Sequence, residues 1–271
     1  MTACNEGFGQ LPLADIKPVD VLAVLRKFEN RRAIESAKRV RIYASAVFDF
    51  AIALGLAEQN PAAPLKAKGV MRQRVAVIHH AAMPAAEIPA FLAKLRAANI
   101  HPSIRGAMKF LVLTALRTGE VLSLLWSDIA PEGTSLTIPA ERMKAARPHT
   151  VLLSAQARAV LEEIRPFSDG RDNVFPGRDP RGPLSSMALL MCLRRMEVKA
   201  TVHGFRSAFS TWAHAAGERP HVIERCLAHA SADKVAAAYN RHDYDREAAE
   251  LWQRWADAIT PASKVAGRRR K

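Results

Sequence analysis

The 271-residue chain is 49% hydrophobic, which is typical of a globular protein with one core or two small ones. Forty Lys and Arg residues stand against 26 Asp and Glu residues, and the formal charge of +14 indicates a polyanionic partner, with nucleic acid as the first candidate. No run reaches the ~18 apolar residues of a membrane-spanning helix. The first ten residues also lack the pattern of a signal peptide. We therefore expect a cytoplasmic protein without a membrane partner.

The first 65 residues predict two amphipathic helices. The first helix covers about residues 19–28, and its core-facing side is expected to hold Val21, Leu22, Leu25 and Phe28. The second covers about residues 31–55 and ends at Gly55. Its predicted apolar stripe consists of Val40, Tyr43, Val47, Phe50, Ala51 and Leu54.

The first half of the second predicted helix is basic. Its cations are Arg31, Arg32, Lys38, Arg39 and Arg41. Charges on a helix are most often only a solvated face, but acidic residues are sparse among these. We favour contact with DNA.

Composition divides the chain into four parts. Residues 1–65 are expected to form a small helical DNA-binding domain, and residues 66–80, rich in Pro, Ala and basic residues, a linker. Residues 81–260 form the second domain, and residues 261–271 are a basic tail that ends in Gly-Arg-Arg-Arg-Lys.

Arg117 stands at a predicted helix break inside an apolar region of the second domain. A buried charge must be paired, so Arg117 can simply join two helices through Glu120 or Asp128. We favour a functional role for Arg117, with Glu120 as the residue that orients it.

Residues 134–154 predict a β-hairpin with β-branched residues at both ends and Lys144 near its tip. A lysine at such a tip is most often only solvated, but a mobile tip can also bring its ammonium into a site. Ser154 is expected to cap the helix that follows.

Three short helices are predicted to converge after residue 202. His203 and Arg206 share the first turn of one helix, where free N–H groups and a guanidinium favour a phosphate. Pro220 opens the next helix, which leads to His229, and Ser231 caps a third that carries Tyr239. Each of these residues alone is more readily explained by packing or surface exposure, but together they suggest a site.

An amphipathic helix is then predicted near the C-terminus. The residues on its apolar side are Leu251, Trp252, Trp255 and Ile259.

The assembled set suits phosphoryl transfer without a metal or other cofactor. It comprises Arg117, Lys144, His203, Arg206, His229 and Tyr239. Two guanidiniums stabilise charge on the nonbridging oxygens, and Tyr239 attacks phosphorus with His203 as the base, because a phenol of pKa ~10 needs activation. Lys144 then protonates the leaving oxygen as general acid, while His229 hydrogen-bonds the phosphate.

Four blocks of the sequence resemble the phage-integrase family of tyrosine recombinases, in particular integrases of prophages and genomic islands. They are LTALRTGEVLSLLWSDI, MKAARPHTVLLS, TVHGFRSAFSTWA and LAHASADKVAAAYNRHDYDREAAELWQRWA, and the resemblance covers about residues 80–260. It implies a mainly α-helical α+β catalytic domain with a small β-hairpin. In the family pattern Arg117 and Arg206 match the paired arginines, Lys144 the hairpin lysine and Tyr239 the nucleophile, while His203 and His229 match the two histidines.

The resemblance also implies an activity and partners. The expected activity is site-specific recombination of double-stranded DNA attachment sites through a 3′-phosphotyrosyl intermediate, without ATP, to integrate or excise a mobile element. The expected assembly is a monomer in solution and a homotetramer on DNA, at the bacterial nucleoid. Tyr244 matches the nucleophile position less well than Tyr239, and we expect it to pack.

The resemblance departs at the N-terminus, where only what resembles the second half of a four-helix core-binding domain precedes the linker. A catalytically silent DNA-binding remnant therefore remains the alternative function. A histidine-based phosphodiesterase is a third and weaker one.

Overall fold

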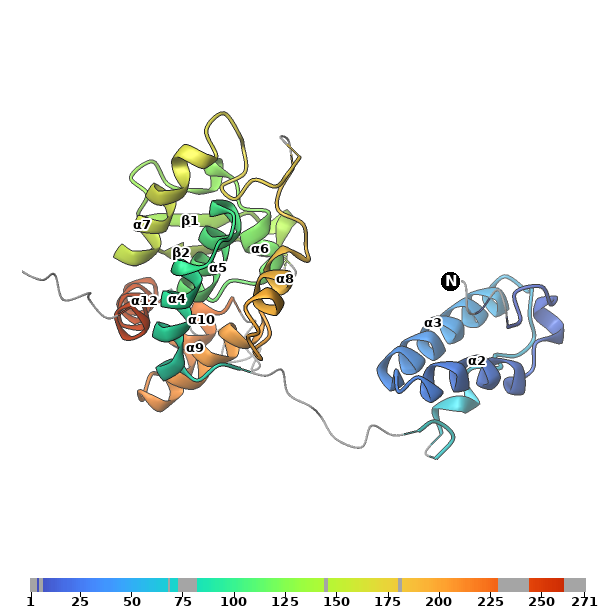
Figure 1. Ribbon diagram of the computed structural model, residues 1–271. Helices are drawn as coiled ribbons and strands as arrows, with labels where there is room; N and C mark the ends of the chain where they lie inside the picture. Colours follow the sequence, from blue (N-terminus) through green and yellow to red (C-terminus); the bar gives the residue numbers. More distant parts are fainter. Residues whose placement is uncertain are drawn as a thin grey trace, which may run out of the picture. The chain divides into compact units, whose positions relative to one another are not determined.

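The computed structural model describes Cys4 and residues 7–67, 69–72, 82–143, 146–179, 182–228 and 244–260. The chain forms two compact units, residues 1–79 and residues 80–271 (Figure 1). Across the described residues, no helix combines the length and the apolar character needed to cross a membrane.

The first unit is built on two helices, α2 (Pro18–Asn30) and α3 (Ile34–Ala53), which pack against each other. Pro18 is the first residue of α2, a position that does not require its missing N–H. The small core lies between these helices and the segments around them, and its buried residues are Ile16, Val21, Leu25, Phe48, Ala62 and Leu65.

Only a small part of the apolar stripe predicted for α3 packs in this unit, namely the buried Ala51 and the partly buried Val40. Tyr43, Val47, Phe50 and Leu54 are 57–68% exposed, whereas Ala37, Phe48 and Ala51 are buried. The apolar sector of α3 is wider than one contact face, and only one side of that sector meets α2. Periodicity identifies an apolar sector but does not indicate which part of it has a neighbour.

Two of the five predicted DNA-contacting cations lie outside α3, because the helix begins at Ile34. Arg31 and Arg32 occupy the turn that follows α2, where Arg32 has a positive φ of 60°. Both side chains are exposed, as are Lys38 and Arg39 on α3. The guanidinium of Arg31 lies over the ring of Phe28.

In its described residues the second unit is mainly helical with a small antiparallel sheet, which confirms the predicted fold class (Figure 1). Its principal helices are α4 (Ile88–Ala97), α5 (Pro102–Thr114), α6 (Thr118–Leu122), α7 (Ala155–Ile164), α8 (Ala188–Arg195), α9 (Gly204–Ala215), α10 (Pro220–Cys226) and α12 (Asp245–Ile259). The sheet pairs β1 (Ser135–Ile138) with β2 (His149–Leu152), so that Ile138 lies opposite His149. These strands confirm the predicted hairpin.

Helix α5 is the centre of the second core, because α4, α7, α8, α9 and α12 all contact it. Helix α12 docks on this core, and the four residues of its predicted apolar side, Leu251, Trp252, Trp255 and Ile259, are buried. Trp255 donates a hydrogen bond from its indole N–H to the Val112 carbonyl at 2.9 Å. The C-terminal helix is therefore an integral part of this unit.

The sequence signals at two helix starts are confirmed. Ser154 precedes α7, and its side chain accepts a hydrogen bond from the Ala157 N–H. Pro220 is the first residue of α10. Both residues act locally, which explains why the sequence alone could identify them.

Candidate functional site

Arg117 is held at the start of α6 by Glu120. Helix α5 ends at Ala115 in a left-handed conformation, with φ of 45°, and Arg117 is the residue that precedes α6. The Glu120 carboxylate accepts from the Arg117 guanidinium at 2.7 Å and from its backbone N–H at 2.9 Å. Glu120 is buried whereas the guanidinium is partly exposed, so the carboxylate orients a cation that remains open to a ligand.

Asp128, the other possible partner of Arg117, belongs to a different ion pair. It accepts from Arg142 and from the Leu125 N–H. Of the two structural pairings that the sequence left open, the structure contains Arg117 with Glu120.

Arg206 lies in the first turn of α9 and is only 5% exposed. Its guanidinium donates to the Ala115 carbonyl at 2.7 Å and to the Leu227 carbonyl. Within the described residues Arg206 has no ion pair with a carboxylate. Its position next to Ala115 brings α9 to the turn that carries Arg117.

The two arginines and Glu120 share one electrostatic environment. The pKa of Arg206 is lowered to about 10, first by burial and then by the positive charge of Arg117, while Glu120 and Glu224 act in the opposite direction. Arg206 is therefore still cationic at neutral pH. A buried cation near the positive end of a helix and beside a second cation is unfavourable by itself, and an anion is the ligand that would stabilise it.

His203 is the residue that precedes α9, and its side chain is exposed. It does not cap the helix, because Thr201 Oγ1 accepts the Gly204 N–H at 2.9 Å instead. His203 thus directly precedes α9 and Arg206 lies in its first turn, with the imidazole exposed and the guanidinium buried.

His149 is a part of this region that the sequence analysis did not single out. It is the first residue of β2 and only 3% exposed, although the three residues before it are exposed. Its pKa is lowered to about 4, first by burial and then by Arg225, with smaller effects from Arg206 and Arg117 and an opposing one from Glu120. The available signal was a histidine at a strand position whose alternation calls for an apolar side chain.

Tyr244 packs, as expected. It directly precedes α12 with φ of 56°, its ring centroid lies 4.5 Å from that of His221, and the residue is partly buried against the core. The other predicted catalytic residues, Lys144, His229 and Tyr239, lie outside the described residues.

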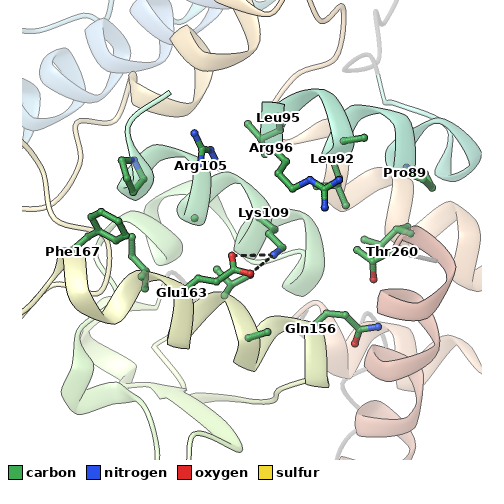
Figure 2. Close-up of a pocket in the computed structure, with 17 residues that line it drawn as sticks. Pro89, Leu92, Leu95, Arg96, Arg105, Lys109, Gln156, Glu163, Phe167 and Thr260 are labelled. Carbon is green, nitrogen blue, oxygen red and sulfur yellow. Dashed lines mark hydrogen bonds and ion pairs between the residues drawn. The ribbon is translucent and has the colours of Figure 1, made fainter. Parts of the chain in front are cut away.

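A pocket of about 720 Å³ between α4, α5, α7 and the end of α12 is a separate feature. Its described lining contains none of the predicted catalytic residues. Figure 2 shows the side chains of Lys109 on α5 and Glu163 on α7 pointing toward each other. Nζ of Lys109 lies 3.2 Å from the Glu163 carboxylate. Arg105 donates to the carbonyls of Ala98 and Ile100. Because its described lining holds none of the predicted catalytic residues, this pocket is not the candidate site.

Comparisons with known proteins identify both parts of the chain. The phage integrase central domain matches residues 1–68, and the phage integrase family matches residues 82–246. Prophage integrase IntZ of Escherichia coli (strain K12) is 40% identical over 255 residues, which cover 93% of this chain and 62% of that protein. The integrase of Shigella phage Sf6 is 35% identical over 260 residues, covering 92% and 65% respectively. The chain thus spans somewhat less than two thirds of the length of these relatives.

Solved structures show the same fold. A lambda integrase dimer bound to a COC' core site has a TM-score of 0.67 at 21% identity, covering 85% of each chain. A lambda integrase tetramer bound to a Holliday junction also gives 0.67, at 22% identity, covering 86% of this chain and 71% of that one. Together with the match over residues 82–246 and the 40% identity to a prophage integrase, this places the chain in the phage integrase family.

Proposed function

We propose that this protein is a site-specific DNA recombinase whose nucleophile is Tyr239. The observation that carries the proposal is the arginine site: the Arg117 guanidinium is oriented by a buried Glu120, and the buried Arg206 lies beside it without a carboxylate partner in the described residues. Two guanidiniums, of which one is paired with a carboxylate, leave an excess positive charge, which a phosphodiester matches. The sequence order of the remaining catalytic candidates is that of the family.

In the proposed cleavage step, the Tyr239 hydroxyl oxygen attacks phosphorus and the bond from phosphorus to the 5′-oxygen breaks. His203, exposed next to Arg206, receives the phenol proton. Lys144 gives a proton to the departing 5′-oxygen, and His229 hydrogen-bonds the phosphate. The products are a 3′-phosphotyrosyl bond and a free 5′-hydroxyl.

Rejoining reverses these roles. The 5′-hydroxyl of another strand attacks the phosphotyrosine, and Tyr239 leaves with its proton restored. Since one phosphodiester is exchanged for another through a covalent intermediate, no nucleotide hydrolysis is required.

The proposed partners follow from the family and from the charge of +14. Double-stranded attachment sites bind the catalytic domain, residues 81–260, and the partial core-binding domain, residues 1–65, which are joined by the linker 66–80 and followed by the basic tail 261–271. The chain is a monomer in solution and a homotetramer on DNA. Lambda integrase has been seen as a dimer on a core site and as a tetramer on a Holliday junction, which supports this assembly.

The test is formation of a covalent adduct on a nicked duplex that carries the attachment site. The native chain is expected to give a protein–DNA band that survives denaturant, and Tyr239→Phe to give none. Tyr244→Phe is the matched control, because Tyr244 packs before α12, and it should retain the adduct.

An adduct that persists in Tyr239→Phe but disappears in Tyr244→Phe would contradict the assignment of the nucleophile. DNA retention without an adduct on any substrate would identify a DNA-binding remnant. Free ends without a protein-linked strand would instead indicate a phosphodiesterase.

A further inference from the structure

The contacts of His149 suggest a role beyond packing. The imidazole is 3% exposed, and its Nδ1 lies 3.4 Å from Nη1 of Arg225 on α10. A guanidinium only donates hydrogen bonds, so Nδ1 must be the acceptor. The proton of the neutral ring is therefore on Nε2.

Arg225 is a junction between three elements. Besides His149, it contacts the Thr150 carbonyl on β2 at 3.1 Å and pairs with Asp245 at the start of α12. Helix α10 ends one residue later, and the carbonyl of the following residue, Leu227, accepts from Arg206. A continuous path of contacts thus runs from His149 through Arg225 and the end of α10 to Arg206.

The residue type matters because the surroundings of His149 are cationic. Arg225, Arg206 and Arg117 all lower its pKa, and of the described residues Glu120 is the one that acts in the opposite direction. A lysine or a charged imidazole would add to the repulsion at the arginine site. A leucine would fill the space but could not accept from Arg225, whereas a neutral imidazole does both.

The Nε2 atom of His149 is buried and has no hydrogen-bond partner among the residues that the structure describes. A buried donor without a partner is destabilising, and packing alone would favour an apolar side chain at this position. The unfavourable burial of the Nε2–H group is therefore explained by the other ring nitrogen, Nδ1, which contacts Arg225.

We propose that His149 is a positioning residue of the arginine site: as the neutral Nε2–H tautomer it accepts a hydrogen bond from Arg225 and thereby fixes the end of α10, on which Arg206 is anchored. The catalytic consequence rests on the proposed recombinase function. The tautomer of His149 and its contact with Arg225 do not depend on that function.

The first measurement is nitrogen NMR of the histidine side chains in the native chain, assigned with His149→Asn. His149 is expected to show an Nε2–H tautomer that stays neutral between pH 5 and 8. A charged ring at pH 6, or an Nδ1–H tautomer, would overturn the proposal whether or not the protein is a recombinase.

The second measurement compares two substitutions in the adduct assay at saturating DNA. His149→Leu removes the acceptor and should slow adduct formation by roughly tenfold or more, since small misplacements of a catalytic group have large effects on rate. His149→Asn places an amide oxygen near the position of Nδ1 and should recover most of that rate. The dissociation constant for DNA should change by no more than about twofold in either variant, because affinity is spread over many phosphate contacts.

Thr137→Val is the matched control. It removes the Thr137–Thr150 hydroxyl pair, which lies on the exposed side of the same hairpin, and should leave the rate unchanged. If His149→Leu lowers the melting temperature but not the rate, the residue is structural and the proposal fails. A native chain that forms no adduct would refute the recombinase function alone, and the NMR result would still decide the contact with Arg225.

Discussion

Glu120 is the residue on which the geometry of Arg117 depends, because its two oxygens accept from both the side chain and the backbone of that arginine. Glu120→Ala should lower the rate of adduct formation by about 100-fold through a misplaced guanidinium, with little change in DNA affinity. Glu120→Gln should be intermediate, since an amide oxygen can accept one of the two bonds but carries no charge. Single-turnover cleavage of a nicked duplex measures the rate of each variant. Equal rates for Glu120→Ala and the native chain would contradict the orienting role of Glu120.

His149 also predicts a dependence of stability on pH. Its pKa is about 4 in the folded chain against an ordinary 6.5, so between these values the unfolded chain binds more protons than the folded one. The contribution of His149 to the free energy of unfolding is therefore greatest above pH 6.5 and decreases as the pH falls toward 4. The loss is roughly 2 kcal/mol by pH 5.

Urea unfolding at pH 7 and pH 5 measures this loss. His149→Asn lacks the titrating ring and should lose correspondingly less stability over the same interval, while the carboxylates shared by both proteins contribute equally to each. Identical losses in the two proteins would show that His149 does not titrate in this way.

At the scale of elements, α12 is anchored in the core of the second unit through Trp255. Trp255 is fully buried, contacts the rings of Phe209 and Trp212, and hydrogen-bonds the Val112 carbonyl on α5. Trp255→Ala should lower the free energy of unfolding by roughly 3–5 kcal/mol. Arg246→Ala, which removes an exposed pair with Glu250 on the same helix, should change it by less than about 0.5 kcal/mol. Denaturant unfolding distinguishes these values, and similar losses would show that α12 is not anchored through Trp255.

The elements that the sequence predicted correctly carry local signals. Pro220 and Ser154 act within one turn, and α12 has an apolar side that repeats regularly enough to identify its buried residues. Helix α3 lacks such a narrow stripe. Its packing depends on where α2 lies, which periodicity does not encode.

The same distinction applies to the site. Arg117 and Glu120 are only three positions apart, so their pairing could be predicted from the sequence. The anchors of Arg206 are the carbonyls of Ala115 and Leu227, which are far from it in sequence and carry no side-chain signature. The contact of His149 with Arg225 is likewise long-range, so it became visible only in the folded chain.

At the scale of the whole molecule, the charge of +14 predicts DNA binding that weakens steeply with salt. Replacing Lys38, Arg39 and Arg41 together with Ala should lower the affinity and reduce the slope of log K against log salt by roughly 2–3, since each phosphate contact contributes about 0.9. Fluorescence anisotropy over a salt series measures the slope. The triple variant should keep the melting temperature of the native chain. An unchanged slope would mean that the first unit contacts DNA through other residues.

The exposed apolar side of α3 has a practical consequence for anyone who handles this protein. The exposed apolar patch on this helix consists of Tyr43, Val47, Phe50 and Leu54. Such patches bind dyes such as anilinonaphthalene sulfonate, whose fluorescence normally indicates a partly unfolded state. The native chain should therefore fluoresce with this dye before any unfolding begins. Val47→Glu combined with Phe50→Glu should abolish that signal without lowering the melting temperature. Dye-based melting curves of this chain would otherwise begin from a high baseline and would report the surface of one helix as if it were disorder.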